Sequence, residues 1–84
     1  MKEHSNMATS VIAVENRTSK EMQFQIEPEC TLFEVPCGKT FEITGTYQNE
    51  PITIQFSDHG GEIFGAIFPG DGDVIIRMEG MEIT

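Results

Sequence analysis

The stretch Ile52-Thr53-Ile54-Gln55-Phe56-Ser57 alternates apolar and polar side chains at every position. Successive side chains of a β-strand point to opposite faces of its sheet, so this period of two predicts a strand with one buried and one wet face. The chain shows no stretch with the longer period of an amphipathic helix. The alternation therefore predicts an all-β protein.

The same pattern recurs on both sides of this stretch. It predicts further strands over residues 9–15, 22–26, 31–35, 40–44, 62–68, 74–78 and 81–83. Turn sequences rich in Gly, Pro, Asn and Asp separate them about every eight to twelve residues, which is typical of small sandwiches and barrels. We expect a flexible tail over residues 1–8 and, over residues 9–84, one small antiparallel sandwich or barrel of seven to eight short strands. Gly45 is expected to mark a bend or bulge.

The apolar positions of these strands predict the hydrophobic core. The residues expected to face inward are Ile12, Val14, Met22, Phe24, Ile26, Phe33, Phe41, Ile43, Ile52, Ile54, Phe56, Ile67, Val74 and Ile76. Burying such a set supplies enough hydrophobic stabilisation for one core, so the domain requires no disulfide or metal.

The two cysteines are expected to be free thiols. Cys30 and Cys37 flank the strand predicted over residues 31–35, and an extended chain of this length separates them by about 23 Å, beyond the reach of a disulfide. Free thiols fit a reducing compartment. The first residues lack the apolar run of a signal peptide, and no apolar run approaches the ~18 residues of a membrane span. These features predict a cytoplasmic protein.

Negative charge is unevenly distributed along the chain. The formal net charge is −9, yet residues 40–76 contain no Lys or Arg. Such a chain is a poor ligand for nucleic acid or an anionic membrane and attracts basic protein surfaces. We therefore predict a non-enzymatic protein-binding module, the alternative being that the charge serves solubility alone. The predicted partner-binding carboxylates are Glu42, Glu50, Asp58, Glu62, Asp71 and Asp73.

The segment Glu62–Phe68 is apolar on both faces, with Phe64 near its middle. A strand of this kind either lies centrally in its sheet or forms an apolar patch that a partner covers. Phe64 therefore joins the predicted partner-binding residues. The alternative function is a homo-oligomeric structural domain, a homodimer that pairs through the Phe64 strand.

Catalytic and metal sites have little support in the sequence. Cys37 and His59 can be drawn as a nucleophile and a base, but no local signature accompanies them. A sandwich with His4, His59, Cys30, Cys37 and five methionines also resembles the cupredoxins, so a metal-binding sandwich that uses His59 and Cys37 is a further alternative. Neither His nor Met follows Cys37 closely enough for the usual copper site, however. Asp71-Gly72-Asp73 is better explained as a tight turn than as a calcium loop. We expect no enzyme activity, metal or cofactor.

Several turn motifs resemble those of a group of small uncharacterised bacterial proteins. The motifs are an Asn-x-Thr turn at residues 16–18, a Glu27-Pro28 dipeptide that closes the second strand, and a Pro-x-Gly turn at residues 36–38. The resemblance covers residues 11–83 and implies an all-β fold without assigning an activity. Those proteins commonly carry Trp-Gly after Glu-Pro, where this chain has Glu29-Cys30.

In size and charge the chain is similar to small acidic phage proteins that antagonise bacterial defence, such as anti-CRISPR proteins. This similarity implies a sharper form of the binding hypothesis, a DNA-mimic inhibitor of a nucleic-acid-handling complex. In such an inhibitor the six carboxylates would occupy a groove that otherwise holds phosphates.

Overall fold

The computed structural model describes residues 7–83, which form eight β-strands. The strands are β1 (Ala8–Glu15), β2 (Met22–Ile26), β3 (Thr31–Val35), β4 (Thr40–Tyr47), β5 (Thr53–His59), β6 (Glu62–Phe68), β7 (Asp73–Met78) and β8 (Met81–Glu82). Within residues 7–83 no helix is long and apolar enough to cross a membrane. The tail predicted over residues 1–8 lies mostly outside the described residues, and Ala8 already belongs to β1.

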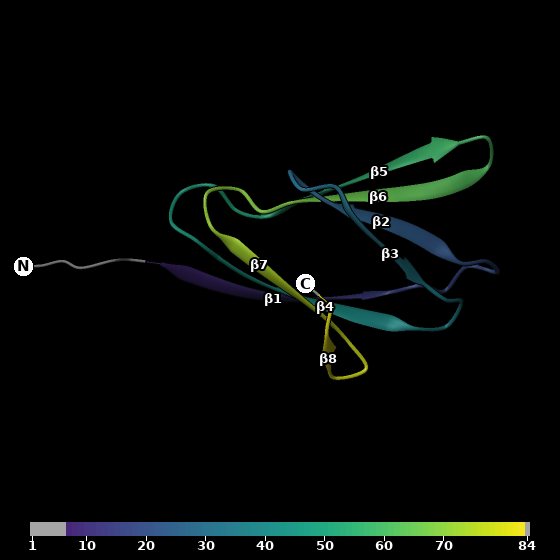
Figure 1. Ribbon diagram of the computed structural model, residues 1–84, viewed down its shortest axis with the longest axis horizontal. Coiled ribbons are helices and arrows are strands. Elements are labelled where there is room, and N and C mark those ends of the chain that lie inside the picture. The colour runs from purple at the N-terminus through teal and green to yellow at the C-terminus, as the bar shows by residue number, and fades with distance from the viewer. Residues whose placement is uncertain (1–6, 84) are drawn as a thin grey trace, which may run out of the picture.

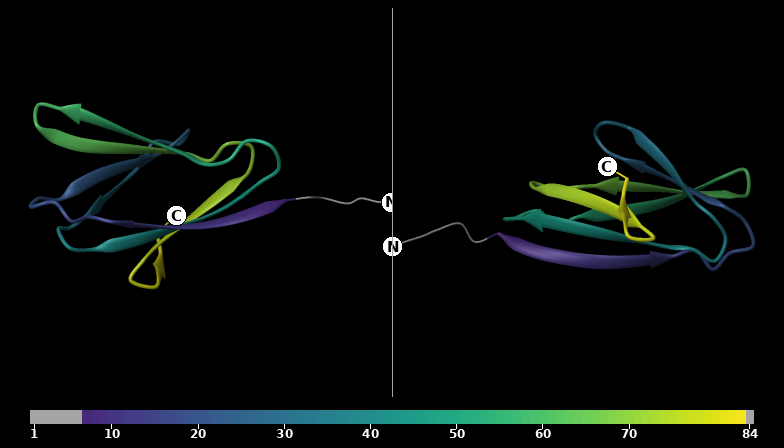
Figure 2. Two further views of the ribbon diagram at one scale, coloured as in Figure 1. Left: turned by 180° about the vertical axis from the view of Figure 1, so that it is seen from behind. Right: turned by 60° about the horizontal axis from the view of Figure 1, so that its bottom comes forward.

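The strands form two four-stranded sheets, in the orders β1-β4-β7-β8 and β3-β2-β6-β5, which face each other as a sandwich (Figures 1 and 2). The predicted all-β sandwich is thus confirmed. One pair departs from the antiparallel expectation, because β2 and β6 run parallel. The chain crosses to the other sheet after β3 and returns as the β5–β6 hairpin, and β6 then fills the place beside β2 in the same direction.

Two local predictions need correction. Between the strands predicted over residues 52–57 and 62–68, the turn contains only Gly60 and Gly61, both at positive φ, so Asp58 and His59 extend β5. No bulge occurs at Gly45, because the ladder runs unbroken from Thr44 through Thr46 to both neighbouring strands. A Cβ at Gly45 would instead collide with the side chain of Ile52. The glycine therefore provides space for core packing.

The core lies between the sheets and is centred on Phe24. Phe24 is fully buried, and its ring centroid lies 4.8 Å from that of Phe41 and 5.5 Å from that of Phe33. Gly65 of the neighbouring strand lies under this ring, where a Cβ would overlap the aromatic carbons. The buried apolar residues are Met22, Phe24, Ile26, Val35, Phe41, Ile43, Ile67 and Ile76, with Ile12, Val14, Phe33, Ile52, Ile54, Val74 and Met78 packed against them.

This core differs from the predicted one at three residues. Val35 and Met78 join it without having been predicted, and Phe56, which was predicted to be buried, is 57% exposed. Phe56 still points toward the core side of its sheet, since its ring centroid lies 6.1 Å from that of Phe24. The prediction was therefore right about the direction of this side chain and wrong about its burial.

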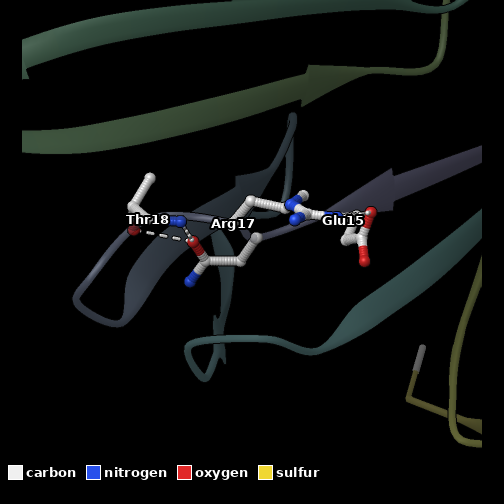
Figure 3. Close-up of polar contacts among 4 residues, drawn as sticks. Glu15, Arg17 and Thr18 are labelled. Carbon is white, nitrogen blue, oxygen red and sulfur yellow. Dashed lines mark hydrogen bonds and ion pairs between the residues drawn. The ribbon is translucent and has the colours of Figure 1, made fainter.

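Asn16 is the buried polar side chain of the described residues. Its Nδ2 donates to the carbonyl oxygens of Lys20 and Val35, both at 2.9 Å. Its Oδ1 accepts hydrogen bonds from the backbone N and the Oγ1 of Thr18, at 2.9 and 2.7 Å (Figure 3). Through these bonds Asn16 joins the β1–β2 turn to the end of β3. The Asn-x-Thr motif thus has a structural role in this fold.

Cys30 and Cys37 are both free, as predicted, and both are exposed. They flank β3, whose five residues hold them at opposite ends of the strand. Gln25 donates a hydrogen bond from Nε2 to the sulfur of Cys30 at 3.3 Å.

Candidate functional site

In the β5–β6 hairpin the inner face of the sheet is exposed to solvent, whereas in β2 and β3 the same face packs in the core. Phe56 lies opposite Gly65 in the ladder, and Asp58 lies opposite Ile63, so these side chains share the face of Phe24. Phe56 is 57% exposed and Ile63 is 44% exposed. Large apolar side chains on the inner face of a sandwich are normally covered by the opposite sheet. We call Phe56, Asp58 and Ile63 of this face, together with Glu62 at the hairpin tip, the hairpin patch; Glu62 lies opposite His59 and points to the outer face.

β5 is also an edge strand, because its sheet has the order β3-β2-β6-β5. Its seven residues contain neither Lys nor Pro, the residues that most often protect an edge from pairing with another chain. The one charged residue among them is Asp58, which points to the inner face. The hairpin patch therefore combines exposed apolar surface with an unpaired row of backbone donors and acceptors.

On the outer face of the hairpin, polar and aromatic side chains contact one another. The Oγ of Ser57 lies 3.2 Å from Nε2 of His59, and the His59 ring stands edge-on to Phe64 at 6.2 Å. Lys20 reaches from the β1–β2 turn to the carbonyl oxygen of Gly61, 3.5 Å away. A shallow pocket at this end of the hairpin is lined by Lys20, Glu21, Gln23, His59, Glu62, Ile63 and Phe64.

Phe64 is half-buried, and its strand β6 lies between β2 and β5. Both backbone edges of β6 are therefore already paired. The sequence offered two explanations for the apolar faces of this strand, a central position in the sheet or a patch that a partner covers. The structure shows the central position. The open edge of this hairpin belongs to β5.

The six predicted carboxylates are all exposed, but they lie in three separate places. Glu42 and Asp73 are on the outer face of the β1-β4-β7-β8 sheet. Glu50 and Asp71 lie in the loops β4–β5 and β6–β7, at the end of the molecule opposite the hairpin tip (Figures 1 and 2). Asp58 and Glu62 flank the tip itself. The six are thus not gathered on one face, and even Glu42 and Asp73 lie four ladder positions apart, since Glu42 is opposite Arg77 and Asp73 is opposite Thr46.

Asp71 has a structural role. Its carboxylate accepts hydrogen bonds from the backbone N–H groups of Gln48, Asn49 and Glu50, at 2.9 to 3.1 Å. These bonds, those of Asn49 and Gln48 first, hold the pKa of Asp71 below its ordinary value, because they stabilise the ionised form. The carboxylate thereby ties the β4–β5 loop to the β6–β7 loop. The sequence predicted only a tight turn here.

Within residues 7–83, Arg17 and Lys39 pair with carboxylates outside the six. Arg17 lies 3.9 Å from Glu15 (Figure 3). Lys39 lies 2.9 Å from Glu79. The hydrogen bond and charge of Glu79 raise the pKa of Lys39, and Lys39 lowers that of Glu79 in the same way. The carboxylates of the hairpin patch have no such ion pair among the described residues, so their charge faces solvent.

The residues considered for catalysis or metal binding lie apart. Cys37 lies in the β3–β4 turn and His59 at the end of β5, in different parts of the fold. Among residues 7–83, no group of three or more His, Cys, Asp or Glu side chains is arranged to hold a metal ion. His4, which entered the copper hypothesis, lies outside the described residues.

Comparison with known proteins found no matching family model, no matching curated protein and no matching solved structure.

Proposed function

We propose that this chain is a non-enzymatic protein-binding module whose hairpin patch engages a basic surface of another protein. The observation that supports it is the exposure of Phe56 and Ile63 on the inner face of their sheet. Interfaces typically have an apolar centre, contributed above all by aromatic residues, within a polar rim. Phe56 and Ile63 provide such a centre, and Asp58 and Glu62 provide an acidic rim.

This proposal narrows the charge-based hypothesis to one region. An inhibitor that replaces a run of phosphates needs several carboxylates on one face, whereas the structure distributes the six over three places. The carboxylate of Asp71 already accepts hydrogen bonds from backbone N–H groups of the β4–β5 loop. The binding role therefore falls to Asp58 and Glu62, which lie beside exposed apolar side chains.

The test is affinity capture from the native host with two charge-reversed proteins. One carries Asp58→Lys and Glu62→Lys in the hairpin patch. The matched control carries Glu42→Lys and Asp73→Lys on the outer face of the other sheet, with the same change of net charge. We expect the wild type and the control to retain the same partner and the hairpin variant to lose it. Equal retention by both variants, or capture that resists about 0.5 M salt, contradicts the proposal, because salt screens exposed charges.

A further inference from the structure

The open edge of β5 lies directly beside the hairpin patch, and the two features together define what can bind. A sheet edge can accept an extended segment as an additional strand, whose backbone supplies affinity and whose alternate side chains supply specificity. An added strand on β5 would place alternate side chains on the inner face, beside Phe56 and Asp58. The bound segment would thus extend the sheet and bury part of the exposed Phe56 side chain.

The edge strands β1 and β3 offer less exposed apolar surface to an added strand. On β1 the inner side chains of Ile12 and Val14 already pack against the core. On β3 the inner side chain of Val35 is fully buried, and the exposed Leu32 points to the outer face. A strand added at either edge would therefore cover little inner apolar surface. Phe33, the aromatic side chain on the inner face of β3, already packs against the core. β5 is the edge at which strand addition buries an aromatic side chain that is mostly exposed, Phe56.

The register of β5 determines the chemistry of the partner. Ile54, Phe56 and Asp58 share the inner face, and Gln55 and Ser57 share the outer face. In an antiparallel addition, the residues opposite Phe56 and Ile54 should be apolar and the residue opposite Asp58 should be basic, because directly opposed side chains contact each other. The outer positions, opposite Ser57 and Gln55, should be polar.

We propose that β5 binds an extended segment of a partner protein by antiparallel strand addition, with the pattern basic–polar–apolar–polar–apolar read from its N-terminus. This inference rests on the proposed function and specifies its binding mode. A second copy of the chain fits less well, since β5 paired with itself about Phe56 sets Asp58 against Ile54 rather than against a base. Two chains of net charge −9 also repel each other.

The probe for this inference is the synthetic peptide Lys-Lys-Thr-Val-Thr-Val-Thr, whose residues would lie opposite His59 back to Thr53. Two further peptides serve as controls. The first replaces both lysines by glutamates, and the second carries N-methyl groups on alternate backbone nitrogens, so that it cannot pair with a strand edge. Binding is followed by amide shifts and hydrogen exchange of the protein. Phe56→Thr and Asp58→Lys test the site, and Leu32→Thr, on the opposite edge of the same sheet, is the matched variant.

We expect the lysine peptide to slow exchange at those amides of β5 that do not pair with β6. Its affinity should fall about tenfold or more with Phe56→Thr or Asp58→Lys and stay unchanged with Leu32→Thr. If the N-methylated peptide binds equally well, or protection appears outside β5, strand addition is overturned while the proposed binding function stands. If the glutamate peptide binds equally well, the acidic residues of the hairpin patch do not select a basic partner. Both the proposed function and the strand addition are then contradicted.

Two remaining outcomes also decide the question. Absence of binding by the lysine peptide to the folded wild type overturns strand addition, and the capture experiment then tests the binding function separately. Protection of the same β5 amides without peptide, together with a dimeric mass in sedimentation, means that a second copy occupies the edge. That result also overturns the proposal.

Discussion

The two halves of the β3-β2-β6-β5 sheet differ in how their inner faces are covered. In the β2–β3 half, Phe24 and Val35 have no exposed surface. In the outer part of the β5–β6 half, Phe56 and Ile63 are about half exposed, although they point to the same side of the sheet. The comparison shows that alternation determines the direction of a side chain, whereas its burial depends on what the opposite sheet places against it.

The two halves also differ in their polar contacts. Asn16 ties the β1–β2 turn to β3 through buried hydrogen bonds. The tip of the hairpin has the exposed contact from Lys20 to Gly61 and the bond from the N–H of Gly61 to Asp58. We infer that folding stability is concentrated in the β2–β3 half and that the hairpin tip can change with little effect on the fold.

The first prediction compares Phe24→Ala with Phe56→Ala. Phe24→Ala leaves a cavity between Phe33 and Phe41 and should lower the free energy of unfolding by about 3–5 kcal/mol. Phe56→Ala removes a side chain that is already 57% exposed and should cost about 1 kcal/mol or less. Chemical denaturation of both variants measures the difference. Equal losses would contradict the division of the sheet into a covered and an open half.

The second prediction concerns the polar contacts of the β2–β3 half. Asn16→Ala leaves the carbonyl oxygens of Lys20 and Val35 without their donor and should cost about 2–3 kcal/mol. Asn16→Asp should destabilise the protein as well, because it sets a carboxylate against those oxygens. Asn49→Ala, at an exposed asparagine of the β4–β5 loop, is the control and should change stability by less than about 0.5 kcal/mol. Tolerance of Asn16→Ala would contradict a structural role for this motif.

The third prediction sharpens the boundary between the halves. Gly65 lies between the covered Phe24 and the open Phe56, and a Cβ there would overlap the ring of Phe24. Gly65→Ala should therefore cost about 1–3 kcal/mol through overpacking. The control is Ala66→Ser, the next residue on the outer face of the same strand. If Gly65→Ala is as well tolerated as Ala66→Ser, the Phe24 ring can move freely and the boundary is not rigid.

The sequence predicted the strands well because their side chains alternate and their turns carry Gly, Pro and Asn. It predicted which side Phe56 faces but not its exposure, since that depends on the extent of the opposite sheet. One signal was present: the alternation of Ile54 and Phe56 continues to Asp58, and a carboxylate at an inner position indicates a wet inner face. The sequence also placed Asp71 with Asp58 among the partner-binding carboxylates. The distribution of charge along a chain does not show which carboxylates accept hydrogen bonds from backbone N–H groups.

The smallest expected effect separates these two kinds of carboxylate. Because backbone N–H groups hold the pKa of Asp71 below its ordinary value of 3.8, its ionised form stabilises the folded state at pH values above that value, and this contribution is lost as the pH falls through the lowered pKa. Asp71→Asn keeps one acceptor oxygen and loses the other, so stability near neutral pH should fall slightly and depend less on acid. Glu62→Gln, in the hairpin patch, is the matched carboxyl-to-amide control.

Thermal unfolding between about pH 2 and pH 7, a range that spans the ordinary carboxyl pKa, compares the three proteins. A wild type and an Asp71→Asn variant with the same acid profile would show that the three loop hydrogen bonds contribute nothing to stability, and Asp71 would then rejoin the carboxylates available to a partner. A changed profile for Asp71→Asn alone assigns Asp71 to the fold. In that case Asp58 and Glu62 remain as the carboxylates that adjoin exposed apolar surface, which is the condition that binding at the hairpin patch requires.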